Sequence, residues 1–318
     1  MAVCVYLGEE LGRYGFGAGH PFGFQRLPAF ETMFRDLGLD HVSCIKKPVF
    51  ALPELIETFH TPEYIARVKM QSANGFGYLD YGDTPAVPGI FEAASYVVGS
   101  TVDAVREIMS GACQRAFIPI AGLHHARRDR AAGFCVFNDC GVAIEVLRKE
   151  FNVRRIAYVD IDAHHGDGVY YAYEEDADVI FVDLHQDGRT LYPGTGAASE
   201  IGKGAALHTK LNIPMRPGAG DADFFASWQA AEKFLASFRP EFILFQCGAD
   251  SINGDPITAM HYTPAAHAHA ARALCQLAER DCRGRLLAMG GGGYNLNNIA
   301  EAWNAVVKEL IQAPSATL

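Results

Sequence analysis

The sequence is organised around short runs of apolar residues, each followed by polar or glycine-rich residues. The runs are nearly continuous rather than alternating, which is typical of parallel strands buried on both faces. The predicted strands are Val3–Leu7, Ala116–Ile120, Ile156–Val159, Val179–Val182, Phe242–Phe245 and Leu286–Met289. Helical spacing recurs between several of them, over residues 93–109, 140–147, 224–238 and 265–278. This alternation predicts an α/β fold in which one parallel sheet has helices on both faces.

The composition is that of one large globular domain. Of 318 residues, 49% are hydrophobic and 20% are charged, so a large core can be buried and bulk disorder is not expected. No stretch rich in Pro, Gly or Ser divides the chain, so we expect a single domain over residues 1–318. The formal net charge of −10 argues against a stable duplex nucleic-acid partner, because such binding needs a basic surface.

The sequence also carries signals about location. Met1–Leu7 lacks a basic region and a cleavage site, and no apolar stretch reaches the length of a membrane span, so we expect neither a secretory signal nor a membrane partner. The eight cysteines include no Cys-x-x-Cys pair, so we expect reduced thiols and a cytoplasmic location. The thiols expected to be buried are Cys4, Cys44, Cys113, Cys247, Cys275 and Cys282. Nothing in the sequence indicates an oligomeric state.

Five of the predicted strands end next to reactive or flexible residues. In doubly wound sheets the functional site lies beyond the carboxyl ends of the strands. The five segments are His124-His125, Asp160–Gly168, Asp183-Leu184-His185, Gly248–Asp250 and Gly290–Tyr294. We therefore expect one functional site to which all five contribute.

The segment after the third predicted strand suggests a metal site. Residues two apart in an extended chain point the same way, so Asp162 and His164 can converge on a cation while Asp160 braces a group behind them. Asp250 is the natural third ligand, and three protein ligands leave a position for water in a catalytic zinc site. The same donors also accept Fe²⁺ or Co²⁺. A polar turn that only caps backbone groups is the alternative, but the density of titratable groups favours a metal.

His124-His125 is a tandem of candidate acid/base groups. Asp160 and Asp167 can each orient one imidazole ring, which would give two His–Asp dyads. Cys135 is not expected to be a nucleophile, since a metal would already supply one.

Three further segments are candidates for substrate contacts or for the surface. The glycine run before Tyr294 lacks the lysine and the spacing of a phosphate-binding loop. Glycines let the backbone approach another surface closely, so the Tyr294 hydroxyl can reach a position from which it donates to an oxyanion. Loops that contain Phe134 and Tyr192 could line a channel for an alkyl chain. Arg127–Arg130 is predicted to be a solvated loop.

Taken in order along the chain, these motifs resemble the zinc-dependent deacetylase family. That family includes the histone deacetylases, bacterial acetoin-utilisation-type deacetylases and acetylpolyamine amidohydrolases, and the resemblance implies the arginase/deacetylase-type α/β fold. The matching segments are His20-Pro21, Arg26, His60–Tyr64, Asp83–Ala86, Gly89–Phe91, His124-His125, Gly133–Asn138, Asp160–Gly168, Pro193–Gly196, Gly248–Asp250, Gly254–Pro256 and Gly290–Tyr294.

The resemblance implies roles for the clustered residues. The implied zinc ligands are Asp162, His164 and Asp250. His125, paired with Asp167, would be the general base and then the general acid, and His124, paired with Asp160, would be its electrostatic partner. Tyr294 would polarise the substrate carbonyl.

The resemblance also implies a substrate tunnel and a potassium ion beneath the zinc. The implied substrate-binding residues are Asp83, Gly133, Phe134, Tyr192 and Gly292. Phe134 and Tyr192 would line the tunnel, and the Gly133 carbonyl would accept the amide N–H. The implied potassium site comprises Asp160, Asp162, His164, Asp183 and Leu184. Tyr192 stands where many members have Phe, and Asp183 stands where many have Ser in the potassium shell.

The implied function is removal of acetyl or other acyl groups from the ε-amine of lysine in proteins or peptides, with release of acetate. Asp83 at the implied tunnel rim, and Ile257 where polyamine-preferring relatives can carry Glu, favour an acyl-lysine substrate. The alternative is a deacetylase of small acetylated amines such as acetylpolyamines. Two further alternatives are arginase-type hydrolysis with two manganese ions and a module that binds acylated ligands without turnover.

Overall fold

The computed structural model describes residues 3–313, and its centre is a parallel sheet. Within these residues the sheet has eight strands in the order β2-β1-β3-β8-β7-β4-β5-β6. Every neighbouring pair is parallel. The strands are β1 (Val3–Tyr6), β2 (Ser43–Lys46), β3 (Arg115–Ile118), β4 (Ile156–Asp160), β5 (Val179–Gln186), β6 (Lys210–Met215), β7 (Phe242–Gln246) and β8 (Leu286–Met289). The predicted α/β class is therefore confirmed.

The two edge strands, β2 and β6, were not predicted from the sequence. All residues of the central strands β3, β4, β5, β7 and β8 are buried, whereas β2 is partly to fully exposed along its length and β6 is only half-buried. An edge strand has a neighbour on one side only, so it needs no continuous apolar run, and it tolerates a proline such as Pro214. The prediction for β5 was too short, because the strand continues through Asp183 and His185 to Gln186.

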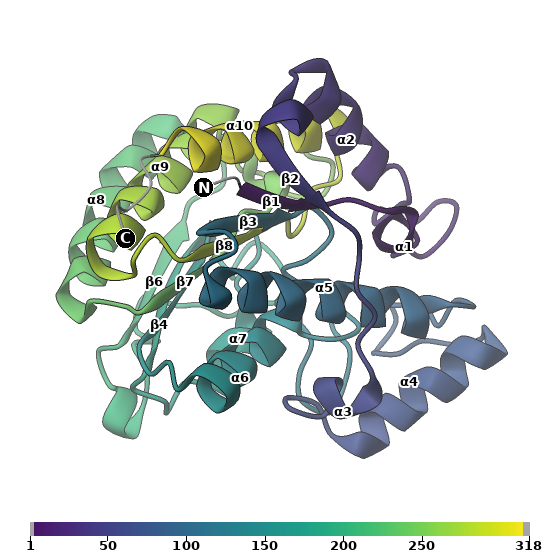
Figure 1. Cartoon of the computed structure of the whole chain (residues 1–318). Coiled ribbons are helices and arrows are strands. Elements are labelled where there is room, and N and C mark those ends of the chain that lie inside the picture. Colours follow the sequence, from purple (N-terminus) through teal and green to yellow (C-terminus); the bar gives the residue numbers. More distant parts are fainter. Residues whose placement is uncertain (1–2, 314–318) are drawn as a thin grey trace.

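Helices cover both faces of the sheet, as predicted (Figure 1). Figure 1 shows α2, α8, α9 and α10 on one face and α5, α6 and α7 on the other. The helices are α1 (Glu9–Gly12), α2 (Arg26–Asp36), α3 (Pro53–Ile56), α4 (Pro62–Asn74), α5 (Ile90–Ser110), α6 (Asp139–Phe151), α7 (Asp167–Ala172), α8 (Asp221–Phe238), α9 (Pro264–Asp281) and α10 (Leu296–Gln312), with 3-10 turns η1 (Leu39–Val42), η2 (Gly204–Ala206) and η3 (Ala249–Ser251). Each predicted helix lies within α5, α6, α8 or α9, and the other helices were not predicted.

The start of α6 fixes the loop that leads to the histidine tandem. Asn138 is the N-cap, and its side-chain oxygen accepts a hydrogen bond from the N–H of Gly141. The buried carboxylate of Asp139, in the first turn, accepts hydrogen bonds from the N–H groups of Gly122 and Leu123. The residues just before His124 are therefore tied to a helix of the core.

Two findings bear on the expected location. Among residues 3–313, no helix is both long and apolar enough to cross a membrane. All eight cysteines are free, and seven of them are buried. Cys44 is exposed, so its predicted burial is wrong; it lies on the edge strand β2, which pairs only with β1 in the described sheet and has exposed residues on both faces.

Candidate active site

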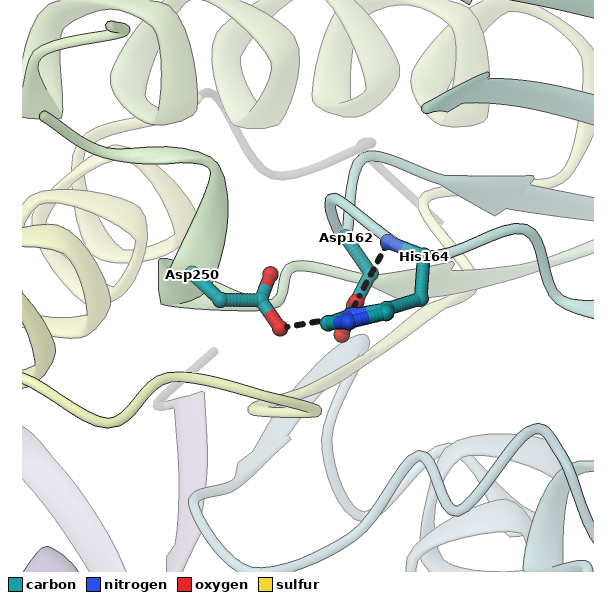
Figure 2. A group of neighbouring side chains, drawn as sticks. All are labelled: Asp162, His164 and Asp250. Atoms are coloured by element: carbon teal, nitrogen blue, oxygen red, sulfur yellow. Dashed lines mark hydrogen bonds and ion pairs between the residues drawn. The ribbon is translucent and has the colours of Figure 1, made fainter. Parts of the chain in front are cut away.

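Asp162, His164 and Asp250 converge beyond the carboxyl ends of β4 and β7. Asp162 and His164 lie in the loop after β4, and Asp250 lies in η3 after β7. Figure 2 shows the two carboxylates facing the His164 ring. The His164 Nδ1 atom is 3.1 Å from Asp162 Oδ1 and 3.1 Å from Asp250 Oδ2. All three residues are buried, and one potential ligand atom from each lies within 4.8 Å of the others.

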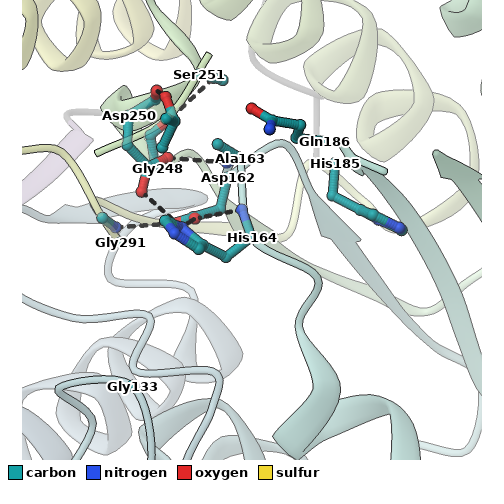
Figure 3. A network of polar contacts seen from close by, with 12 residues as sticks. Gly133, Asp162, Ala163, His164, His185, Gln186, Gly248, Asp250, Ser251 and Gly291 are labelled. Carbon is teal, nitrogen blue, oxygen red and sulfur yellow. Dashed lines mark hydrogen bonds and ion pairs between the residues drawn. The ribbon is translucent and has the colours of Figure 1, made fainter. Parts of the chain in front are cut away.

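The physical reason for this convergence differs from the one predicted. β4 ends at Asp160, and residues 162–164 form a bend rather than extended chain. The Asp162 carboxylate accepts a hydrogen bond from the N–H of His164 at 3.0 Å, which closes a local turn and brings the two side chains to the same side. The Asp250 carboxylate accepts from the N–H of Ala163 at 2.8 Å, so β7 and β4 are joined through the site (Figure 3).

The remaining oxygen of Asp162 is fixed by two more donors. Asp162 Oδ2 accepts hydrogen bonds of 2.8 Å each from the Gln246 side chain and from the N–H of Gly292. A Cβ atom on Gly292 would lie only 2.1 Å from Asp250 Oδ2, so the glycine run is what lets the backbone approach both carboxylates. Gln246 was not identified in the sequence, although it is the polar last residue of the otherwise apolar strand β7.

The three groups compete for protons. Burial disfavours the charged ring of His164, but the hydrogen bonds and charges of Asp162 and Asp250 raise its pKa to about 10. Burial and the charge of Asp162 raise the pKa of Asp250 to about 7. Two carboxylates and one imidazole are a donor set that suits a divalent first-row metal, which binds these atoms in place of protons. The residues therefore fit a metal ion.

The histidine tandem forms two His–Asp dyads beside this triad. His124 Nδ1 lies 2.7 Å from Asp160 Oδ2, and His125 Nδ1 lies 2.7 Å from Asp167 Oδ1. The two Nε2 atoms face each other at 3.1 Å. The ring centroid of His125 is 5.9 Å from that of His164, so the dyads and the metal-binding triad share one site.

The two dyads differ in charge. Burial alone would lower the pKa of His124, but the negative charges of Asp160 and Asp162 raise it to about 9. Burial and the positive charge of His124 lower the pKa of His125 to about 4, despite the hydrogen bond to Asp167. At neutral pH the site therefore contains a charged His124 and a neutral His125.

Two residues around the dyads were missed or misjudged. The Tyr158 hydroxyl donates a 2.6 Å hydrogen bond to Asp160 Oδ2; this residue lies two positions before Asp160 on the same face of β4. Arg127 is not part of a solvated loop, because its guanidinium donates to Asp167 Oδ2 at 2.6 Å and its side chain is only 22% exposed. A run of three arginines in four residues gave no indication that one of them turns inward.

Tyr192 contacts a dyad, while Tyr294 and Phe134 contact each other. The Tyr294 ring packs edge-on against Phe134 at 5.8 Å, and the Tyr192 ring packs edge-on against His125 at 5.1 Å. The Tyr294 hydroxyl makes no hydrogen bond with residues 3–313, and burial raises its pKa well above 10. A Cβ atom on Gly133 would lie 2.5 Å from His125 Cδ2 and 2.9 Å from Tyr192 Cε1, so this glycine lies directly between them.

Three of the other predicted site residues lie in an exposed loop or in a buried strand. Asp83 is exposed in a non-helical loop, as expected. Asp183 and Leu184 are buried in β5, where the Asp183 carboxylate accepts hydrogen bonds from His185 Nδ1 at 2.7 Å and from the N–H of Gly166 at 2.8 Å. Asp183 therefore lies beneath the dyads, in a strand rather than after one.

Comparison with known proteins gives a consistent result. Residues 20–310 match the histone deacetylase domain family. The chain is 36% identical over 306 residues to acetoin utilization protein AcuC of Bacillus subtilis (93% of this chain, 79% of the relative) and 33% identical over 287 residues to histone deacetylase 8 of Xenopus tropicalis (88% and 76%). The crystal structure of the HDA15 HD domain superposes with a TM-score of 0.90 at 28% identity, covering 98% of this chain and 88% of that one. With its parallel sheet, its two dyads and its triad, this chain belongs to the histone deacetylase family.

Proposed function

We propose that this chain is a metal-dependent deacetylase that removes acetyl or other acyl groups from the ε-amine of lysine in proteins or peptides and releases acetate. The observation that carries the proposal is the position of His125: its Nε2 atom faces that of His124 at 3.1 Å, its Nδ1 atom lies 2.7 Å from Asp167, and its ring centroid is 5.9 Å from that of His164 in the Asp162/His164/Asp250 triad. Burial and the charge of His124 lower the pKa of His125, which favours the neutral ring that a base requires. Hydrolysis of an amide needs such a base, a cationic centre and a proton donor in one place. Membership of the histone deacetylase family supports the chemistry.

Asp162, His164 and Asp250 would bind the metal. Zinc suits these nitrogen and oxygen ligands, and Fe²⁺ or Co²⁺ could use the same donors. When bound, the ion supplies Lewis acidity and makes water more acidic. We also propose a structural potassium ion at Asp160, Asp162, His164, Asp183 and Leu184, supported by the three buried carboxylates of this group.

The two histidines would divide the proton transfer. The Nδ1–H group of His125 would donate a hydrogen bond to Asp167 and keep its proton, so that the lone pair of Nε2 can accept a proton from the attacking water. The protonated ring then returns that proton to the leaving amine. Charged His124 places a positive charge beside His125 and favours the negative charge that develops on the substrate.

The neighbouring residues would position the substrate. The Tyr294 hydroxyl donates to the carbonyl oxygen as negative charge develops there. Phe134 and Tyr192 form the walls around the alkyl chain, the Gly133 carbonyl accepts the amide N–H, and Gly292 lines the floor beside Asp162. Asp83 at the rim accepts N–H groups of the peptide backbone.

We also propose that residues 1–318 act as one catalytic unit and that the chain works in the cytoplasm. The family match over residues 20–310 and the single sheet support the first proposal. The eight free thiols support the second, since thiols stay reduced in that compartment.

The test is an acetate-release assay with the metal-reconstituted chain. It compares acetyl-lysine peptides with acetylputrescine and acetylspermidine, with Asp162→Ala as the inactive control. We expect kcat/KM to be at least about tenfold higher for the peptides, the scale of one charge-assisted hydrogen bond at the rim. Turnover of the acetylpolyamines alone would establish the alternative substrate class, and binding without acetate release would contradict an enzyme.

A further inference from the structure

A cavity of about 470 Å³ opens beside the proposed tunnel mouth. Asp83, Arg130 and Tyr192 contribute to its lining. Because the Tyr192 ring also packs against His125, a group in this cavity would lie next to an acyl-lysine whose amide is at the dyads.

Most charged groups of the cavity are already bound within the protein. Asp80 accepts hydrogen bonds from the N–H groups of Gly82, Asp83 and Thr84, and also from the Thr84 hydroxyl. Arg127 and Asp167, which also line the cavity, are paired with each other at 2.6 Å. These groups have little capacity left for a ligand.

Arg130 and Asp83 have weaker partners within the protein than the other charged groups of the cavity. Among the polar groups of residues 3–313, the Arg130 guanidinium pairs only with the adjacent Asp129, at 3.2 Å. The two side chains are 43% and 62% exposed, and such an ion pair contributes little to stability. Asp83 forms no ion pair with any residue in 3–313, and its Oδ1 atom accepts one long hydrogen bond, of 3.2 Å, from the Thr84 hydroxyl. Partial burial together with the nearby Asp80 carboxylate raises the pKa of Asp83 to about 7. The cavity thus offers a ligand one cationic donor and one acceptor.

We propose that this cavity binds a carboxylate next to the acyl-lysine of the substrate, and that Arg130 selects it while Asp83 accepts N–H groups of the same unit. The inference rests on the proposed function. A guanidinium binds a carboxylate through two parallel hydrogen bonds, so Arg130 suits this ligand. The carboxylate can come from an acidic side chain beside the acyl-lysine or from the α-carboxylate of a C-terminal acyl-lysine.

The experiment uses the metal-reconstituted chain and two matched pairs of fluorescent peptides. In one pair acetyl-lysine is followed by Asp or Asn, and in the other it is C-terminal with a free carboxylate or a carboxamide. Acetate release gives kcat/KM, and fluorescence anisotropy gives Kd. Arg280→Gln is the matched control for Arg130→Gln, because Arg280 also pairs with an adjacent aspartate, Asp281, but lies on α9, away from the cavity.

We expect the charged peptide of at least one pair to bind about 3- to 10-fold more tightly than its neutral partner, with the larger ratio in the pair that supplies the natural carboxylate. The ratio should fall to about 1 in Arg130→Gln, remain unchanged in Arg280→Gln, and decrease with added salt. Equal Kd values within both pairs, or a ratio that survives Arg130→Gln, would overturn the inference. A failure of every peptide to release acetate would instead contradict the proposed function.

Discussion

The two histidines of the tandem share almost everything except charge. They are adjacent in the chain, both are buried, and each has an aspartate oxygen 2.7 Å from its Nδ1 atom. Yet the pKa is raised to about 9 for His124 and lowered to about 4 for His125. The hydrogen-bonded partner therefore does not decide which ring is protonated.

The difference in pKa comes from the charged groups around each His–Asp dyad. Burial lowers the pKa of His124. The negative charges of Asp160, Asp162 and Asp183 raise it, and together they outweigh burial. His125 has Asp167, but part of that charge is neutralised by Arg127, and the ring faces the positive charge of His124. Two adjacent histidines thus become a cation and a base largely through carboxylates that lie 36 to 59 positions further along the chain.

The largest expected effect is loss of turnover when the triad is damaged. It tests whether the two dyads can support catalysis without the metal that the triad is proposed to bind. Asp250→Ala removes one of the three proposed metal ligands and leaves His164 with a single carboxylate partner. We expect roughly one divalent ion per wild-type chain, and loss of both the metal and measurable turnover in the variant. Metal analysis and the acetate assay check this. Stoichiometric metal in the purified variant would show that Asp250 is not a ligand.

The next effect separates the two histidines. His125→Ala should lower kcat by about 10²- to 10⁴-fold, the range for a lost general base. Wild-type kcat/KM should rise as pH increases through about 4, where His125 loses its proton, and fall as pH increases through about 9, where His124 loses its charge. His124→Ala should abolish only the fall at high pH and retain the rise at low pH. If a full pH profile of His124→Ala instead lost the rise at low pH and kept the fall at high pH, then His124 would be the general base and His125 the charged partner.

Tyr294→Phe should have a smaller effect and should leave both limbs of that profile in place. Removing one oxyanion donor costs about 10²- to 10³-fold in kcat. Because burial raises the pKa of Tyr294 well above 10, its hydroxyl remains a donor across the whole profile. Metal content and thermal stability serve as controls for an intact site. A variant within a few-fold of wild type would show that Tyr294 only packs against Phe134.

The central strands and the site were predictable for the same reason. Strands buried on both faces need continuous apolar runs, and the polar residues that follow them stand out, so the clusters at His124, Asp162 and Asp250 were visible in the sequence. The edge strands carry no such run. Two residues that contact the site were harder to recognise, because Tyr158 lies inside the apolar run of β4 and Gln246 reaches Asp162 only through the pairing of β7 with β4.

Arg127 shows the limit of sequence analysis most clearly. Three arginines in four residues suggest a solvated loop, but the chain turns back on itself there, with the N–H of Arg127 donating to the carbonyl of Arg130 at 2.9 Å. That turn sends the three side chains in different directions. Arg127 reaches Asp167, Arg128 reaches the carbonyl of Phe59, and Arg130 stays at the cavity. Only the folded backbone assigns their different partners.

The smallest predicted effect concerns the pairing of Arg127 with Asp167. It tests whether this ion pair contributes to the difference in pKa between His124 and His125. In Arg127→Gln, the charge of Asp167 is no longer neutralised, so it favours the protonated form of His125 more strongly and the pKa of His125 should rise. The low-pH limb of kcat/KM should therefore move to higher pH, by less than about one pH unit because Arg127 is partly exposed, while the high-pH limb stays in place. Arg128→Gln is the matched control, since Arg128 contacts Phe59 and Glu145 rather than a dyad, and it should move neither limb. If the low-pH limb of Arg127→Gln stays in place or moves to lower pH, then Arg127 does not set the charge that His125 experiences, and burial together with His124 alone explains why the two rings differ.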